Sequence, residues 1–363
     1  MLGSSEAVAD AGIRELGAAD EAKWNAFLSQ HPDSNLYHTL EWRDFVVEVF
    51  GHKPFYLFAE KGADISGILP MFLVSMPLLG TKLGSKLISL PYDIGSGGGL
   101  THDAATETAL VRRAIALAHE VGAGYLQLRY SAPRPQLGAL ELELSQPVVL
   151  SELELKDEKT VWSNVSRNHW RSLRKAESLG VRVSEAETWE EFRQVEQIIL
   201  EVFRDFGTPP YGPRYFKSLW RRMHPTGQLR ALLAHIGSRC VGGQLNFCSG
   251  KTLVCKLSLC LPEAAAQGVN VALFKRCIEM AFHLGYRKVS WGTSSHDQKG
   301  LIEFKDKWGS KSQPVGIYSQ AIKGTVPDLG KYYNSTGIER RIWRKLPLGL
   351  TRMGGAVLSR WFC

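Results

Sequence analysis

An internal repeat is the feature that most constrains how this 363-residue chain can fold. Residues 56–68 align with residues 231–243, and residues 109–122 align in the same order with residues 272–285. The first pair reads as two strands joined at a glycine turn, and the second as an amphipathic helix that ends at a glycine. The sequence therefore predicts two copies of one mixed α/β unit, each with a central sheet flanked by helices.

The alignment depends on identical residues at equivalent positions. These pairs are Leu57/Leu232, Ala59/Ala234, Gly62/Gly237 and Gly67/Gly242 in the hairpin, then Ala109/Ala272, Leu110/Leu273, Arg113/Arg276, Ile115/Ile278, Ala118/Ala281 and Gly122/Gly285 in the helix. The offset falls from 175 to 163 residues between the two alignments, which predicts a 12-residue insertion in the first copy within residues 78–100.

The repeat and the charge distribution together divide the chain into three parts. We expect a first domain over residues 11–155, a second over residues 156–323, and a basic helical tail over residues 324–363. The net charge is +8, and residues 323–363 alone hold eight Lys and Arg against two acids. Because the rest of the chain is nearly neutral, the composition gives no support for DNA binding.

The apolar segments and the cysteines point to an intracellular protein. The longest uncharged apolar run, between Asp64 and Lys82, contains two prolines and is too short to span a membrane. No signal peptide is recognisable at the N-terminus, so we expect a cytoplasmic location. The six cysteines form no CxxC pair and read as reduced core residues, and we expect no metal site.

Four segments, in their order, resemble the FemAB-like tandem-GNAT transferases, most of all the subgroup associated with exosortase and exopolysaccharide clusters. They are residues 34–57, 166–181, 207–219 and 301–309. The resemblance implies transfer of an acyl or aminoacyl group to an amine of a cell-envelope precursor, in a cleft between two GNAT units. The donor would be acyl-CoA or aminoacyl-tRNA, with no tightly bound cofactor. The acceptor would be a nucleotide-linked or lipid-linked sugar or peptide.

The same resemblance implies a catalytic role for Lys305. A lysine in the corresponding Phe-Lys pair stabilises the oxyanion of the tetrahedral intermediate, and Phe304 would contribute backbone or shape. Acyl transfer places negative charge on the carbonyl oxygen, which a fixed cation offsets. The alternative interpretation is a surface lysine beside a core pair of Phe304 and Trp308.

A row of cations on one predicted helix is a candidate phosphate-binding site. Arg167, Arg171, Arg174 and Lys175 recur at helical spacing, with Asn168 and His169 beside them. Guanidinium groups bind phosphates bidentately, and both candidate donors carry phosphates. The alternative is a solvated helix face that pairs with Glu177.

Four further residues are candidates through their places in the resemblance. Asp93 would be the base that takes the amine proton, and Tyr211 would contact the acceptor. At the end of a predicted strand, Gly292 would allow close backbone approach and Ser294 would hydrogen-bond a ligand. For each of the four, a role in a turn explains the residue equally well.

The sequence does not identify the acyl donor, because the loop that usually binds coenzyme A is incomplete. A GNAT domain that uses coenzyme A usually carries a Gln/Arg-x-x-Gly-x-Gly/Ala loop before its second main helix, and here residues 264–273 keep only Gln267 and Gly268. Fem-type members lack this loop as well. The sequence offers no Ser-His-Asp or Cys-His arrangement, so we expect direct attack without a covalent enzyme intermediate.

Alternatives remain for the structure of the tail and for the function of the protein. Residues 336–362 mix cations with apolar residues, which suits an amphipathic helix at an anionic inner membrane surface, interrupted at Pro347 and near Gly354. The alternative is a helix packed on the protein body. For function, the alternatives are an acyl-CoA-dependent N-acetyltransferase of an amino sugar and a non-catalytic scaffold in envelope polysaccharide assembly.

Overall fold

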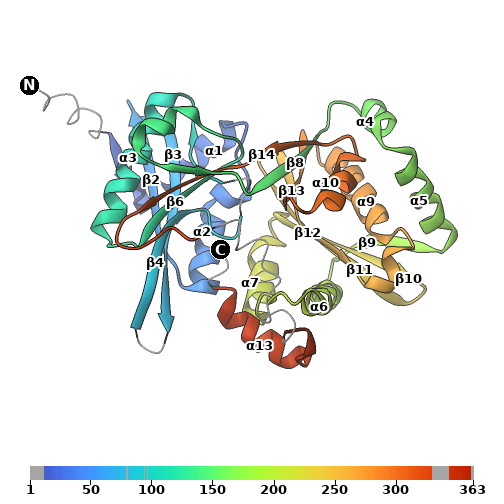
Figure 1. Cartoon of the computed structure of the whole chain (residues 1–363). Helices are drawn as coiled ribbons and strands as arrows, with labels where there is room; N and C mark the ends of the chain where they lie inside the picture. The colour runs from blue at the N-terminus through green and yellow to red at the C-terminus, as the bar shows by residue number, and fades with distance from the viewer. Residues whose placement is uncertain (1–11, 79–80, 94, 96, 329–342, 361–363) are drawn as a thin grey trace, which may run out of the picture. The chain divides into compact units, whose positions relative to one another are not determined.

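The structure is a computed structural model, and it describes residues 12–78, 81–93, 95, 97–328 and 343–360 (Figure 1). The chain divides into two compact units, each built on its own sheet. Of the described residues, those up to 149 and residues 313–328 form the first unit. Residues 150–312 and 343–360 form the second. In the part of the chain so described, no helix has the length and apolarity that crossing a membrane requires.

The first unit is a sheet in the order β1-β2-β3-β4-β6-β15-β7, with β5 paired to β3. Helix α3 packs on β2 and β3, and α1 also contacts β3. The strands are β1 (Ile13–Glu15), β2 (Lys53–Lys61), β3 (Asp64–Leu78), β4 (Thr81–Ser89), β5 (Leu100–Thr101), β6 (Tyr125–Tyr130), β7 (Glu143–Ser145) and β15 (Gly316–Ala321). The longer helices are α1 (Glu21–Gln30), α2 (Leu40–Phe50) and α3 (Ala104–Glu120).

The second unit is a sheet in the order β14-β8-β13-β12-β11-β10-β9. Its strands are β8 (Val148–Glu154), β9 (Val181–Glu185), β10 (Leu229–Ile236), β11 (Arg239–Ser249), β12 (Thr252–Cys260), β13 (Lys288–Ser295) and β14 (Lys311–Pro314). Its helices are α4 (Glu158–Asn164), α5 (Arg167–Ser178), α6 (Trp189–Phe206), α7 (Pro213–Met223), α8 (Pro262–Ala265), α9 (Val269–His283), α10 (Lys299–Asp306) and α13 (Leu348–Leu358).

The hairpins of the two units repeat each other residue for residue. Ala59 faces Gly67 across β2 and β3, and Ala234 faces Gly242 across β10 and β11. In both hairpins the register shifts at the residue after that alanine. The equivalences that the sequence alignment predicted are therefore equivalences in space.

The helix that follows each hairpin contacts the same glycine. A Cβ on Gly67 would lie 3.2 Å from Leu110 of α3, and a Cβ on Gly242 would lie 3.2 Å from Leu273 of α9. Leucine and glycine are matched pairs in the alignment, so helix and sheet meet at the same point in both units. Only glycine leaves room for this close packing. The predicted mixed α/β fold with a repeated unit is confirmed.

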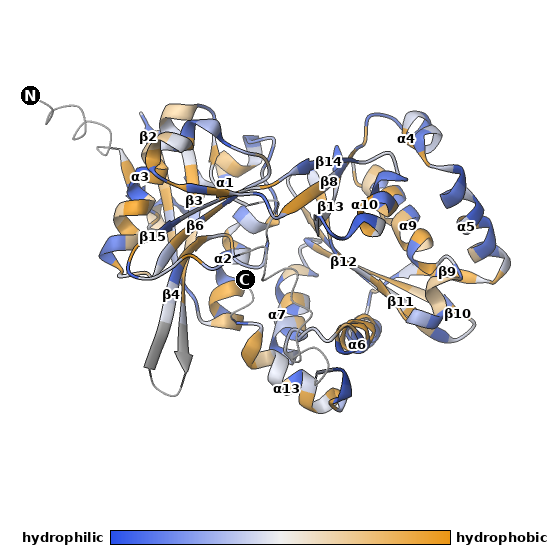
Figure 2. Cartoon of the chain, in the orientation of Figure 1, coloured by the Kyte–Doolittle hydropathy of each residue, from blue (hydrophilic) through white to orange (hydrophobic). Residues whose placement is uncertain are grey.

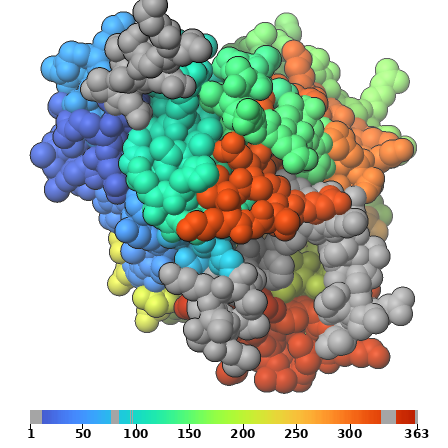
Figure 3. Space-filling view, turned by 60° about the vertical axis from the view of Figure 1, so that its left-hand side comes forward, coloured from blue at the N-terminus to red at the C-terminus, as the bar shows by residue number. Residues whose placement is uncertain are grey.

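One strand of each sheet comes from the other half of the sequence. β15 pairs with all six residues of β6 in the first sheet, while β8 joins β13 in the second. In Figure 3 the orange-red segment that contains β15 lies beside the teal part of the first unit. We expected a single change of domain near residue 155 and a second domain that ended at 323. The domain boundaries differ from this expectation because β6 and β13 each pair with their parallel neighbour over three residues only, and each has a second partner on its other edge, β15 for β6 and β8 for β13.

The described part of the tail forms α13, which packs on α6 and α7. Pro347 caps the start of the helix as its sequence position suggested, but the helix continues through Gly354 and Gly355. The expected interruption there is wrong because these glycines serve packing. A Cβ on Gly355 would lie 2.2 Å from the carbonyl oxygen of Pro210. The remaining tail residues, 329–342 and 361–363, lie outside the described residues.

Candidate active site

The carboxyl end of β13 carries two buried polar side chains, Ser294 and Ser295. The ladder between the parallel strands β12 and β13 joins Thr252–Val254 to Lys288–Ser290, and both strands continue beyond it. Ligands in α/β folds bind at the carboxyl ends of parallel strands. Gly292, at a φ of +68°, turns the backbone of β13 just after the ladder ends, a conformation that favours glycine.

Lys305 of α10 reaches this strand end. Its side chain is only 3% exposed, and Nζ donates to the carbonyl oxygens of Gly292 at 3.0 Å and Thr293 at 3.4 Å. Nζ also donates to Oγ of Ser294 at 2.9 Å. We call these four residues the Lys305 cluster. The alternative interpretation of Lys305 as a surface lysine is therefore wrong, and the structure brings Lys305, Gly292 and Ser294 together.

The electrostatics of the cluster are those of a buried cation held by neutral groups. Burial lowers the pKa of Lys305 to about 8, while the nearby Cys255 and Asp306 act in the opposite direction. Within the described residues no carboxylate lies at ion-pair distance from Nζ. A buried charge without a counter-ion is costly unless it serves a purpose, and stabilising developing negative charge is one such purpose.

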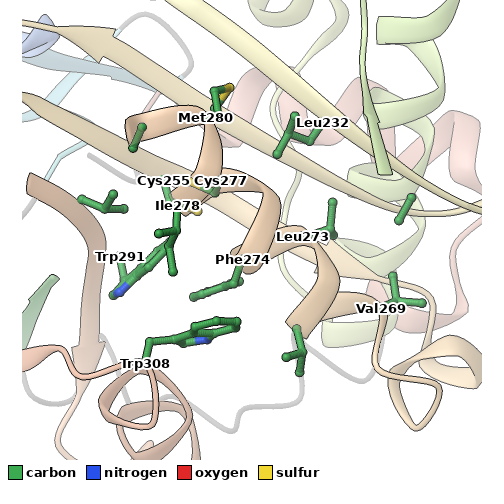
Figure 4. Packing of buried hydrophobic residues seen from close by; sticks show 14 of the residues in the cluster. Leu232, Cys255, Val269, Leu273, Phe274, Cys277, Ile278, Met280, Trp291 and Trp308 are labelled. Carbon is green, nitrogen blue, oxygen red and sulfur yellow. The ribbon is translucent and has the colours of Figure 1, made fainter. Parts of the chain in front are cut away.

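Phe304 precedes Lys305 in α10 and packs against the hydrophobic core of the second unit. Its ring packs edge-on against His169 and Phe274, at centroid distances of 4.9 Å in both cases. Its carbonyl oxygen accepts a hydrogen bond from Nε2 of His169 at 3.0 Å, which ties α10 to α5. Figure 4 shows Phe274 with Trp291 and Trp308, two further rings of this core. Phe304 thus acts on the shape and position of α10.

The arginines of α5 form an exposed face. Arg167, Arg171 and Arg174 are all exposed, and the blue of α5 in Figure 2 reflects this polar surface. Asn168 accepts a hydrogen bond from Arg171 at 3.0 Å. Among the described residues none of the three arginines forms an ion pair, including with Glu177. In the described residues these guanidinium groups are therefore not neutralised by a carboxylate at ion-pair distance.

The opposite side of α5 covers the start of α9. Gly268, at a φ of +83°, precedes α9, and a Cβ placed on it would lie 2.6 Å from the carbonyl oxygen of Ser172 and 3.2 Å from Cβ of Ala176. Nζ of Lys175 donates to the carbonyl oxygen of Ala266 at 2.8 Å and holds α5 to the same loop. A phosphate binds a helix N-terminus through open N–H groups, and here α5 lies against that end.

Asp93 and Tyr211 are the two remaining candidates that the sequence offered. Asp93 belongs to the first unit, is 9% exposed, and its main-chain carbonyl accepts a hydrogen bond from Arg129 at 2.7 Å. It follows Leu90 and Tyr92, both at positive φ, so this loop holds backbone strain. Tyr211 precedes α7 and is half-buried, with its ring stacked on Tyr215 at a centroid distance of 4.0 Å.

Sequence reasoning missed a buried polar row next to the cluster. Gln244 and Asn246 on β11 are fully buried, and Asn246 donates to the amide oxygen of Gln244 at 3.3 Å. Cys277 donates to the side-chain oxygen of Asn246 at 3.3 Å. The alternation of polar residues within an apolar strand was the available signal. The five described cysteines are free, as predicted, and Cys363 lies outside the described residues.

Comparisons with known proteins agree with this architecture. Residues 163–305 match the family described as acetyltransferase (GNAT) domain. Among solved structures, FemX is similar with a TM-score of 0.67 and 11% identity, over 86% of this chain and 97% of FemX. No curated protein matches the chain by sequence.

Two further solved structures cover almost the whole chain. A tandem GNAT protein from the clavulanic acid biosynthesis pathway has a TM-score of 0.53 and 11% identity, over 87% of this chain and 99% of its own. L-PGS from Bacillus licheniformis has a TM-score of 0.55 and 10% identity, over 90% and 97%. At such identities the likeness establishes the fold. The predicted tandem-GNAT fold is confirmed, and the GNAT domain confirms the predicted class of enzyme, an acyltransferase.

Proposed function

The chain has an acetyltransferase (GNAT) domain within a tandem-GNAT fold, and from this premise we propose that it transfers an acyl or aminoacyl group to an amine of a cell-envelope or exopolysaccharide precursor. The observation that carries the proposal is Lys305, a buried cation held by neutral acceptors at the end of β13. We place the reaction in the cytoplasm, at the inner face of the membrane.

The reaction is a direct displacement at the carbonyl carbon of the donor. The amine nitrogen forms the new C–N bond, the carbonyl oxygen becomes negative, and the C–O or C–S bond to the carrier breaks as the carbonyl re-forms. The proton lost by the amine ends on the departing carrier. Lys305 stabilises the oxyanion through its charge.

A covalent intermediate on cysteine is disfavoured by the state of the thiols. Burial raises the pKa of Cys255 and Cys248 to about 12 and that of Cys260 to about 11. Because the thiolate is the nucleophile, such thiols are inert near neutral pH. The role of Asp93 as the base that accepts the amine proton stays a prediction, as do the ligand contacts of Tyr211.

Replacing Lys305 tests the proposal. Lys305→Met keeps the length of the side chain and removes its charge, so we expect kcat to fall by about 10²–10³-fold while the protein stays folded. Lys299→Met, on the exposed start of the same helix, is the matched control and should keep its activity. Transfer of a radiolabelled acyl group to an amine acceptor measures the rate, and circular dichroism checks the fold.

A non-catalytic scaffold is the second candidate, favoured by one observation. All three hydrogens of Lys305 Nζ are donated to protein acceptors, as they would be in a lysine of purely structural importance. A scaffold should show no transfer with any donor, and Lys305→Met should change only its stability. Full transfer activity in Lys305→Met would refute the catalytic role.

The position of α5 affects where the phosphates of the acyl donor can bind. GNAT domains take acyl-CoA as co-substrate, and coenzyme A needs a site for its diphosphate. Since α5 lies against the start of α9, we propose that donor phosphates bind the exposed Arg167, Arg171 and Arg174 instead. The same face suits aminoacyl-tRNA, whose binding weakens with salt as phosphates release counter-ions.

Thermal stabilisation by acyl-CoAs and by charged tRNA identifies the donor. A ligand that binds only the folded state raises the melting temperature by mass action. The double variant Arg171→Gln, Arg174→Gln should lose most of the shift for either donor, because it removes two phosphate partners. Arg182→Gln, on β9 of the same unit, is the control. An unchanged shift in the double variant would contradict phosphate binding by α5.

A further inference from the structure

One face of α13 anchors the helix to the second unit. Thr351, Gly355 and Ser359 recur at helical spacing and are buried. Gly355 lies directly on the carbonyl of Pro210, and Arg352 forms an ion pair with the buried carboxylate of Glu196 at 2.5 Å. These contacts fix which side of the helix faces away from the protein.

The opposite face of α13 presents a row of apolar side chains. Leu350, Met353 and Val357 are 54%, 71% and 62% exposed and follow one another at i, i+3 and i+7. Met353 is the most exposed of the large apolar residues in the described chain. Single exposed apolar residues are common, but an aligned row on an anchored helix is typical of a surface that meets another apolar phase.

The segment of chain that carries this row is positive. Residues 343–360 hold four Lys and Arg and no Asp or Glu. Arg344 and Lys345, just before α13, are exposed, whereas Arg352 is paired with Glu196. Figure 3 shows α13, in red, at the surface of the molecule. An apolar row beside unbalanced cations is complementary to a layer of acyl chains under anionic headgroups.

We propose that α13 binds the surface of an anionic bilayer, with Leu350, Met353 and Val357 inserted below the headgroups and Arg344 and Lys345 at the phosphates. A second copy of the chain is a poorer occupant, because a symmetric contact would bring two positive surfaces together. The ring of Trp343 packs on Gly354 and covers the flank of the helix. This proposal rests on the proposed function, and it identifies α13 as the surface through which the protein would bind the inner face of the membrane.

Sedimentation of the full chain with lipid vesicles tests this surface. We expect binding to vesicles of phosphatidylcholine mixed with phosphatidylglycerol, weaker binding at high salt, and little binding to phosphatidylcholine alone. The triple variant Leu350→Ser, Met353→Ser, Val357→Ser should lower the vesicle partition coefficient at least about tenfold, because three apolar side chains no longer enter the bilayer. Leu179→Ser, 44% exposed after α5, is the matched control.

Three results would overturn the proposal. They are equal binding by the triple variant and the wild type, equal binding to neutral and anionic vesicles, and a wild-type dimer in gel filtration that the triple variant dissociates. The melting temperature of the triple variant should match the wild type, since all three positions are exposed. Acyl transfer to a soluble amine is measured separately, so that loss of vesicle binding and loss of the proposed reaction are distinguishable.

Discussion

The two repeated units share their scaffold and differ at the end of the strand that follows the repeated helix. In the first unit that strand, β6, carries Arg129, which aligns with Gly292 of β13. Arg129 is buried and donates to the side-chain oxygen of Gln127 and the main-chain carbonyl of Asp93. In the second unit glycine takes that place, and the cation is Lys305 from a separate helix. Arg129 therefore stabilises β6 and the loop that contains Asp93, whereas Lys305 is bonded to the carboxyl end of β13.

The starts of the two repeated helices differ in the same direction. Asp103 caps α3 by accepting from the N–H of Thr106 at 2.8 Å, and Glu107 lies in the first turn. α9 begins after Gly268 without a side-chain cap and has no acid in its first turn. An acid at a helix N-terminus repels anions. In the first unit both the cation and the helix start are therefore satisfied by neighbours in the same unit, whereas the second unit, where we propose the reaction, has neither arrangement.

The sharpest test of this asymmetry is the pH dependence of the rate. Burial lowers the pKa of Lys305 from 10.5 to about 8, so the charged form is lost as the pH rises above about 8. If the charge drives transfer, kcat should fall by about tenfold per pH unit above that value. The falling limb should be absent from the residual activity of Lys305→Met. A wild-type profile that stays level to pH 10 would contradict a catalytic charge in the second unit.

Lys305 should also make the free energy of unfolding depend on pH, in the direction opposite to that of kcat. Between about 8 and 10.5 the unfolded chain keeps the proton of Lys305 and the folded chain releases it. Because the unfolded state then binds more protons, the free energy of unfolding should rise with pH across this window. Urea unfolding of the wild type and Lys305→Met at several pH values measures the difference. A Lys305 contribution that decreases with rising pH would show that its pKa is not lowered.

A pair of glycine substitutions tests the shared part of the scaffold. Gly67→Ala and Gly242→Ala each place a Cβ about 2.7 Å from a methyl group of the opposing helix or strand, Thr101 in one case and Val269 in the other. We expect each to lower the free energy of unfolding by about 1–3 kcal/mol through overpacking. Gly300→Ala, where nothing lies within 4 Å, is the control. Clearly unequal losses in chemical unfolding would show that the two helix–sheet contacts are not equivalent.

The repeat was readable from the sequence because close packing and positive φ restrict both copies to glycine at matched positions. Gly67 and Gly242 meet the helices, while Gly122 and Gly285 end them with φ near +70°. The burial of Lys305 could not be derived in this way, because two of its three partners are backbone carbonyls of a strand end that any sequence would supply. The exchange of β8 and β15 was missed for a similar reason, since strand pairing leaves no residue signature over such separations.

The smallest predicted effect concerns the capped start of α3. Asp103→Ala removes the acceptor of the Thr106 N–H and an acid from the positive end of the helix dipole, so we expect a loss of about 1 kcal/mol in unfolding free energy. Hydrogen bonds to Thr106 lower the pKa of Asp103, so the loss should shrink as the pH falls and the carboxyl is protonated in both states. Asp64→Ala, at the start of β3, is the control. No comparable loss can be produced at α9, which has no side-chain cap to remove. If Asp103→Ala left stability unchanged, the first helix would be as weakly defined at its start as the second, and the contrast between the two units would be confined to their cations.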